Sequence, residues 1–143
     1  MTAREVSPGL FVRGITPPLH LADYRLVAFD MDSTLINIEC VDEIAEAAGR
    51  RREVSAITEA AMRGEIADYK ESLRLRLALL KGVPESALHE VYAKHLQLNP
   101  GVERFVQACR AAGCKTLLVS GGFTFFSDRV RERLALDFAR ANV

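Results

Sequence analysis

Residues 26–35 read LVAFDMDSTL, a short apolar run that ends at two aspartates, Asp30 and Asp32. A continuous apolar run of this length is typical of a strand buried on both faces of a parallel sheet. A second run of this kind, KTLLV at residues 115–119, leads directly into the sequence SGG at 120–122. Because ligands bind at the carboxyl ends of the strands in open α/β sheets, both polar sequences are expected to face a functional site.

The sequence between the two runs predicts helices and no strand. Apolar residues recur there at three- and four-residue intervals, and several segments end at a glycine, which is common after the last turn of a helix. These helical segments lie within residues 41–48, 54–61, 69–80 and 84–92. We therefore expect an all-helical cap, over residues 39–100, inserted after the first strand.

The remaining sequence divides into an arm and two parts of a core. Residues 1–24 are rich in proline and glycine, show no sustained periodicity, and are expected to form an irregular amino-terminal arm. The core would comprise residues 25–38 and 101–143, the second part holding an amphipathic helix, the second strand and another helix. The final ALDFARANV is compatible with the start of a third strand. This order of elements predicts an α/β fold with a parallel sheet.

The composition is that of an ordinary globular domain. The 143 residues include 19 Lys+Arg and 19 Asp+Glu, and 49% are hydrophobic, which excludes intrinsic disorder and argues against a nucleic-acid partner. No apolar run approaches the ~20 residues that span a bilayer, and the amino terminus lacks the apolar stretch of a signal peptide. The three cysteines, Cys40, Cys109 and Cys114, lack CxxC spacing, which suits a reducing cytosol. We expect a cytoplasmic protein with no membrane partner.

Both polar sequences suit phosphoryl-transfer chemistry. Two carboxylates close together after a buried strand need compensation, which Mg²⁺ supplies because it prefers hard oxygen ligands. One carboxylate can attack phosphorus while its neighbour protonates the leaving oxygen. Ser120 and two glycines ahead of a helix offer a hydroxyl and unhindered N–H groups to a phosphate. The alternatives are a capped turn, in which Asp32, Ser33 or Thr34 begins the next helix, and a plain strand-to-helix turn.

The longer sequence around these motifs carries a family resemblance. The string VAFDMDSTLINIECVDEIAEAAG at 27–49 and the string LLVSGGFTFF at 117–126 closely resemble the first and second motifs of phosphoserine phosphatases in the haloacid dehalogenase superfamily. The intervening EAAMRGEIADYKESLRLRLALLKG at 59–82 is similar to their helical cap. The resemblance implies a Rossmann-like parallel sheet core, incomplete in this sequence, with the all-helical cap inserted after its first strand.

The resemblance also implies a role for each matched residue at the two strand ends. Asp30 matches the nucleophile that forms an aspartyl phosphate. Asp32 matches the acid/base that protonates the serine leaving group and then activates water. Mg²⁺ would be held by the Asp30 carboxylate and the backbone carbonyl of Asp32, with a third acid from a later motif. Ser120 and Gly121 match the residues that contact the phosphate.

In the cap, the resemblance implies residues that bind the serine part of the substrate. Glu39 matches the residue that holds the ammonium group and Arg76 the one that holds the carboxylate, charges that suit these groups. Met62 and Tyr69 fall where the cap shields the site from water. The predicted function is Mg²⁺-dependent hydrolysis of the small molecule O-phospho-L-serine, the last step of serine biosynthesis. The first alternative is a related phosphatase or phosphotransferase that acts on another small phosphorylated metabolite.

Two further motifs of the resembling family have no counterpart in this sequence. No Lys follows Ser120, and the later acids, Asp128, Glu132 and Asp137, have the surroundings of a helix surface. We therefore expect the sequence to be the amino-terminal portion of a longer enzyme, truncated or incomplete, with an open apolar sheet edge. On its own it would be inactive, and a catalytically inactive fragment that acts as a binding module is the second alternative.

Overall fold

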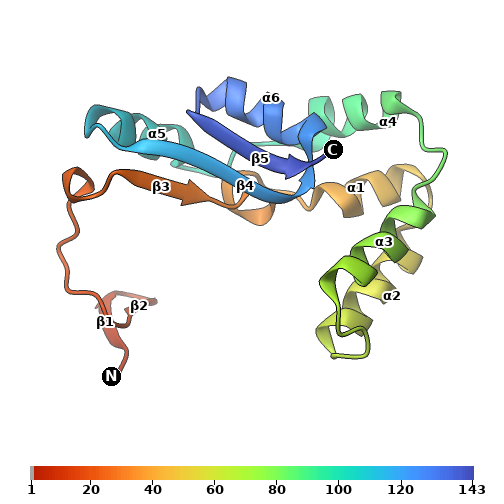
Figure 1. Ribbon diagram of the computed structural model, residues 1–143, viewed down its shortest axis with the longest axis horizontal. Helices are drawn as coiled ribbons and strands as arrows, with labels where there is room; N and C mark the ends of the chain where they lie inside the picture. Colours follow the sequence, from red (N-terminus) through yellow and green to blue (C-terminus); the bar gives the residue numbers. More distant parts are fainter. Residues whose placement is uncertain (1) are drawn as a thin grey trace.

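The computed structural model describes residues 2–143 and contains a three-stranded parallel sheet with helices on one face. The strands are β3 (Leu26–Phe29), β4 (Lys115–Phe123) and β5 (Phe138–Asn142), in the order β3-β4-β5 (Figure 1). The parallel register places Leu26 opposite Lys115 and Leu117 opposite Phe138. The prediction of an α/β fold is confirmed, and the final residues of the chain form its third strand.

Helices α5 (Val102–Ala111) and α6 (Thr124–Leu134) cover one face of the sheet (Figure 1). Their apolar sides meet the strands in one core, because alternate residues of a strand point to the same face. Leu118 of β4 and Phe126 of α6 are fully buried in this core. Met31, from the turn after β3, is buried in the same core, so that turn is held firmly against the sheet.

The opposite face of the sheet carries exposed apolar side chains. Leu26, Val119 and Phe138, one from each strand, are each 48% exposed. Strand alternation and the observed register place these three side chains on the face away from α5 and α6. The apolar sequence of these strands is typical of strands that are buried on both faces. Within the residues that the structure describes, however, helices cover the sheet on one face alone.

The segment between β3 and α5 is helical, as the sequence predicts. It comprises α1 (Cys40–Ala47), α2 (Arg51–Met62), α3 (Tyr69–Leu79) and α4 (Glu85–Glu90), followed by a helical turn at Val91–His95. Helices α2 and α3 pack against each other and project from the end of the sheet (Figure 1). A bridge between Ile36 and Leu98 joins the segments that enter and leave the cap, so its two connections to the core lie side by side.

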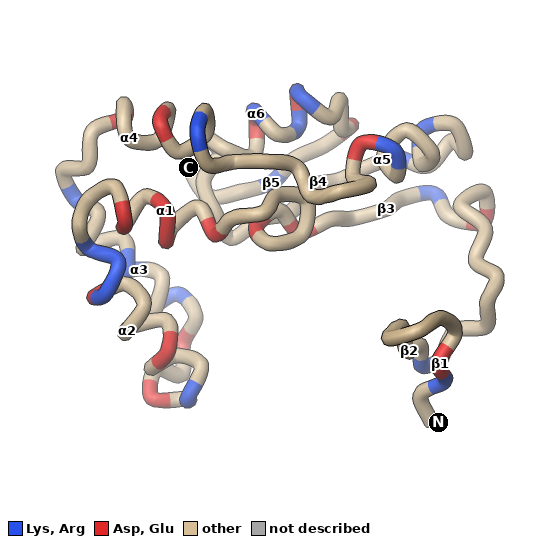
Figure 2. Tube along the Cα trace, turned by 180° about the vertical axis from the view of Figure 1, so that it is seen from behind, with Lys and Arg blue, Asp and Glu red and all other residues tan. Residues whose placement is uncertain are grey.

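Basic and acidic residues are interspersed along the cap helices and α6 (Figure 2). In the cap, Arg50 forms an ion pair with Glu53 at 3.9 Å, and Arg51 forms one with Glu46 at 3.5 Å. This mixture agrees with the formal net charge of zero. Among residues 2–143, no helix has the length and apolar character needed to cross a bilayer.

The amino-terminal residues differ from the expected irregular arm. Strands β1 (Arg4–Ser7) and β2 (Leu10–Val12) form an antiparallel hairpin that lies apart from the sheet (Figure 1). Gly9, in the turn, has a φ of +77°, and its N–H donates to the Glu5 carboxylate at 2.9 Å. The prediction is wrong here because strands of four and three residues are too short to show a clear two-residue periodicity.

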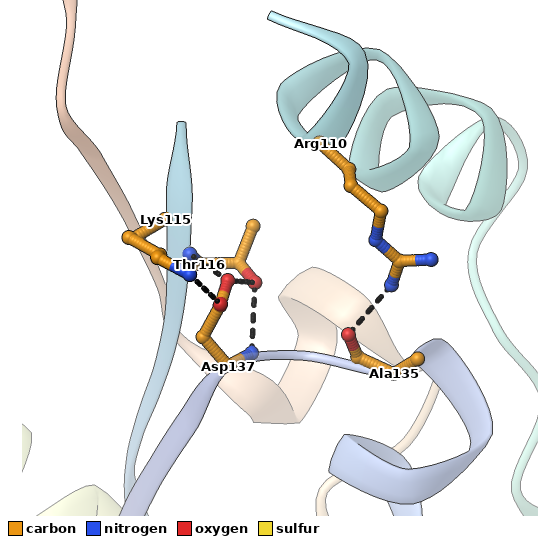
Figure 3. Close-up of polar contacts among 5 residues, drawn as sticks. All are labelled: Arg110, Lys115, Thr116, Ala135 and Asp137. Atoms are coloured by element: carbon orange, nitrogen blue, oxygen red, sulfur yellow. Dashed lines mark hydrogen bonds and ion pairs between the residues drawn. The ribbon is translucent and has the colours of Figure 1, made fainter. Parts of the chain in front are cut away.

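One carboxylate, at the connection between α6 and β5, joins these elements to β4 (Figure 3). Asp137 accepts hydrogen bonds from Lys115 Nζ at 2.7 Å and from the N–H and hydroxyl of Thr116 at 2.9 and 3.0 Å. These donors, Lys115 first among them, lower the pKa of Asp137 to about 2. Arg110 of α5 donates to the Ala135 carbonyl at 2.7 Å in the same connection. Asp137 therefore joins two strands and does not lie on the helix surface expected for it.

Candidate active site

The two aspartates of the first motif lie directly after β3. Asp30 follows the last residue of the strand, is exposed, and accepts a hydrogen bond from the Met31 N–H at 2.8 Å. The chain then makes a short turn over Met31–Leu35, and the side chains at both ends of this turn are buried in the core. These buried ends hold the polar residues between them at the edge of the sheet.

Asp32 has an environment unlike that of Asp30. Its Oδ1 atom is buried and, among the residues that the structure describes, has no hydrogen-bond partner. Burial raises the pKa of Asp32 to about 6; the charges of Glu39 and Asp30 add to the rise, while hydrogen bonding by Cys40 opposes it. A carboxyl group with this pKa changes its protonation state close to neutral pH, as a residue that acts first as acid and then as base must do.

The structure does not support the capped-turn alternative for this motif. The next helix, α1, begins at Cys40, and Glu39 occupies its N-cap position without a side-chain capping bond. Asp32 and Ser33 have non-helical backbone conformations within the preceding turn. None of the three residues proposed as a cap therefore begins a helix of the cap domain.

The second motif lies at the end of β4, which runs past the predicted residues 115–119 to Phe123. The strand is longer than predicted because β5, from later in the chain, pairs with this end of it. The Gly122 N–H donates to the Ser120 hydroxyl at 2.9 Å. A Cβ at Gly122 would lie 3.7 Å from Asp32 Oδ2, so the ends of β3 and β4 meet at one edge of the sheet.

The cap adds residues from two of its helices at the same place. Glu39 precedes α1, while Tyr69 and Arg76 lie on α3. A Cβ at Gly121 would overlap the Tyr69 hydroxyl, so α3 lies directly against the end of β4, with a glycine beneath the tyrosine. Arg76 is half-buried, and its Nε donates to the Ser72 carbonyl at 3.4 Å within α3. Side chains of both charges therefore lie over the strand ends.

These residues line a cavity of about 250 Å³ between the cap and the sheet. Every site residue predicted from the sequence contributes to its lining: Asp30, Asp32, Glu39, Arg76, Ser120 and Gly121. The lining is completed by Val41, Asp42, Tyr69, Leu73 and Gly122. The cavity thus brings together residues from two strand ends and two cap helices, and the roles assigned to them stay predictions.

One residue expected over the site lies elsewhere, and two unexpected residues line the cavity. Met62, at the end of α2, is 85% exposed and lines a neighbouring groove of about 340 Å³. Asp42 and Leu73 lie within the sequences that resemble the family but have no predicted role in the site, yet both line the cavity. Each lies three residues from a predicted site residue, Glu39 or Arg76, and three-residue spacing on a helix was the signal available for them.

The two aspartates fit a hard divalent cation. The exposed carboxylate of Asp30 is a hard oxygen ligand of the kind that Mg²⁺ prefers, and the carboxylate of Asp32, whose Oδ1 has no partner among residues 2–143, lines the same cavity and adds negative charge. The described part of the chain contains no group of three or more His, Cys, Asp or Glu side chains that could hold an ion. Within the described residues the two aspartates would therefore be the acids nearest a cation, and Mg²⁺ commonly keeps several water ligands as well.

Comparison with known proteins gives matches over almost the whole chain. A family model described as haloacid dehalogenase-like hydrolase matches residues 24–142. The chain is 67% identical over its full length to a phosphoserine phosphatase of Polaromonas sp. (strain JS666 / ATCC BAA-500), of which it covers 61%. It is 64% identical to a phosphoserine phosphatase of Albidiferax ferrireducens over 96% of this chain and 58% of that protein. The chain therefore spans about 60% of the length of these curated relatives.

Solved structures show the same partial coverage. A structure described as a phospho-aspartyl intermediate analogue of phosphoserine phosphatase is 38% identical, with a TM-score of 0.75 over 82% of this chain and 56% of that chain. A substrate-bound phosphoserine phosphatase complex is 37% identical, with a TM-score of 0.75 over 82% of this chain and 55% of that chain. The likeness covers most of this chain and little more than half of each solved one.

Proposed function

Because the chain belongs to the haloacid dehalogenase-like hydrolase family, we propose that its cavity binds O-phospho-L-serine and that the protein hydrolyses this substrate to L-serine and phosphate. The observation that supports this best is that one cavity collects the strand-end aspartates, a Ser-Gly pair, an acidic cap residue and a basic cap residue. O-Phosphoserine carries a phosphate, an ammonium and a carboxylate group, so the cavity offers a complementary group for each.

The proposed binding mode assigns each part of the substrate to its own residues. Glu39 would hold the ammonium group, and the planar guanidinium of Arg76 would hold the carboxylate by paired hydrogen bonds. The phosphate would lie at the end of β4, where Ser120 offers a hydroxyl and Gly121 a backbone N–H. Tyr69 would lie across the entrance and keep water from the reacting atoms.

The two aspartates would perform successive steps. Asp30 is assigned as the nucleophile because it is exposed: its carboxylate oxygen bonds to phosphorus while the bond from phosphorus to the serine oxygen breaks. Asp32 donates its proton to that oxygen, and L-serine leaves. The Asp32 carboxylate then takes a proton from a water molecule whose oxygen bonds to phosphorus, and phosphate leaves as Asp30 is restored. Asp32 must be protonated in the first step and ionised in the second, and its pKa of about 6 makes both forms accessible near neutral pH.

Two further parts of the proposal rest on the family. Mg²⁺, held by Asp30 and Asp32, would supply positive charge beside the phosphate oxygens. Because the reaction releases free L-serine, the proposed role of the protein is the last step of serine biosynthesis. The proposed location is the cytoplasm. Since the chain spans about 60% of its curated relatives, the activity is proposed for the protein that carries these residues.

Asp30→Asn tests the proposal, because it removes the nucleophile while keeping the size of the side chain. It should abolish the release of phosphate from O-phosphoserine and the trapping of beryllofluoride in the presence of Mg²⁺. Asp128→Asn, the same change at an exposed position on α6, is the control and should keep full activity. Hydrolysis that persists in Asp30→Asn would contradict the assignment of Asp30 as the nucleophile. If a phosphate ester without an ammonium group is hydrolysed as fast as phosphoserine, the assignment of phosphoserine as the substrate is wrong.

A further inference from the structure

Ser33, between the second aspartate and the cap, has an uncommon backbone conformation. Its φ of +53° and ψ of +11° lie in the left-handed region, which residues with a Cβ adopt infrequently. Such conformations persist where the surrounding contacts impose them, and they cluster at functional sites. The contacts that hold Ser33 in this conformation therefore point to what it does.

These contacts join Ser33 to Glu39. The Ser33 N–H donates to the Ile38 carbonyl at 3.1 Å, and the Ser33 hydroxyl donates to Glu39 Oε1 at 2.6 Å. A hydrogen bond of this length to a carboxylate is charge-assisted. Within residues 2–143, Glu39 makes no other side-chain hydrogen bond, so its Oε2 atom is free to accept one from a ligand in the cavity that Glu39 lines.

The loop that separates these two residues is itself fixed. Asn99 Nδ2 donates to the carbonyls of Thr34 and Ile36 at 2.9 and 3.0 Å, and Ile36 is fully buried. The Ser33 hydroxyl is thus presented from a firmly held turn. Its hydrogen bond restrains the flexible Glu39 side chain to one direction.

We propose that Ser33 is a positioning residue that orients the Glu39 carboxylate for the ammonium group of the substrate. The inference rests on the proposed function, which assigns that ammonium group to Glu39. The restraint reduces the conformational entropy that the carboxylate loses on binding, because its direction is already set. The ammonium group is remote from the reacting phosphorus, so its contact is the same in the ground and transition states, and the restraint acts on KM more than on kcat.

Three substitutions of Ser33, made in the protein that carries these residues, separate the hydroxyl from the backbone. Ser33→Ala removes the hydroxyl and keeps the Cβ, whereas Ser33→Gly removes the hydroxyl and relieves the left-handed backbone. Ser33→Asn tolerates this backbone and restores a side-chain N–H donor. KM and kcat would be measured with O-phospho-L-serine and with p-nitrophenyl phosphate, which lacks an ammonium group. Glu39→Gln, measured in parallel, tests the proposed function.

Ser33→Ala and Ser33→Gly should each raise the KM for phosphoserine about fivefold. Ser33→Asn should bring this KM most of the way back to the wild-type value. Both kcat and the KM for p-nitrophenyl phosphate should change less than about twofold. A phosphoserine KM that stays unchanged in Ser33→Gly, or an equal rise for both substrates, would overturn the inference. If the Ser33 variants behave as wild type while Glu39→Gln raises the phosphoserine KM, the inference fails and the proposed function stands. If Glu39→Gln leaves that KM unchanged, the assignment of the ammonium group fails and the inference fails with it.

Discussion

The raised pKa of Asp32 predicts a change in stability that can be measured without substrate. Burial raises this pKa from 3.8 to about 6 in the folded protein, while the unfolded chain keeps the lower value. Between the two values the folded state binds more protons than the unfolded state, so the free energy of unfolding falls as the pH rises. Asp32→Asn removes the buried charge with little change of shape. It should therefore stabilise the folded protein above the folded-state pKa.

The size of the gain follows from the size of the shift. A rise from 3.8 to about 6, at ~1.4 kcal/mol per unit, gives about 3 kcal/mol at about pH 8. At about pH 4 the gain should be less than about 1 kcal/mol, because the carboxyl group is then protonated in the folded state and half protonated in the unfolded state. Asp32 Oδ1 has no partner to lose among the described residues, and the hydrogen bonding by Cys40, which lowers the pKa, is already included in the net rise to about 6.

Urea unfolding of both proteins at the two pH values, with a chelator to remove divalent cations, measures these gains. Asp128→Asn is the matched control, because it makes the same change at an exposed position on α6 and should have equal effects at both pH values. Added Mg²⁺ should narrow the difference, because the Asp32 charge that the substitution removes favours binding of the cation to the folded wild type. A gain of the same size at both pH values, or a loss at about pH 8, would refute the argument from burial.

Three further predictions concern the closure of the cavity, the sheet and the substrate carboxylate. Gly121→Ala would place a Cβ against the Tyr69 hydroxyl and should lower kcat/KM for phosphoserine about tenfold; adding Tyr69→Ala should recover part of the loss, and purely additive effects would argue against the contact. Asp137→Asn should lower the free energy of unfolding by about 1 kcal/mol at neutral pH, after allowance for solvent screening. Because the lowered pKa stabilises the ionised form, this loss should shrink as the pH falls from 3.8 towards 2 in urea unfolding, and a constant loss would speak against it. Arg76→Lys should raise the KM for phosphoserine about tenfold and spare phosphoethanolamine, which has no carboxylate; equal rises would exclude carboxylate binding by this residue.

Periodicity predicted most elements of the fold because it reflects geometry within a few residues. The cap helices, α5, α6 and the first residues of β3 and β4 all follow apolar patterns visible in the sequence. It failed for β1 and β2, which are too short to show a pattern. It also failed for the end of β4, where pairing with the distant β5 extends the strand through glycines that otherwise favour a turn.

The site divides in the same way between local and distant causes. Residues such as Asp30, Asp32 and Ser120 could be identified without coordinates, because they follow buried strands and parallel strands end at a common edge. The folded chain was needed to bring Glu39 and Arg76 of the cap into one cavity with them, and to distinguish an exposed Asp30 from a half-buried Asp32 whose Oδ1 atom is fully buried. Burial, desolvation and close contacts such as that of Tyr69 with Gly121 depend on neighbours in space, and a linear pattern does not specify those neighbours.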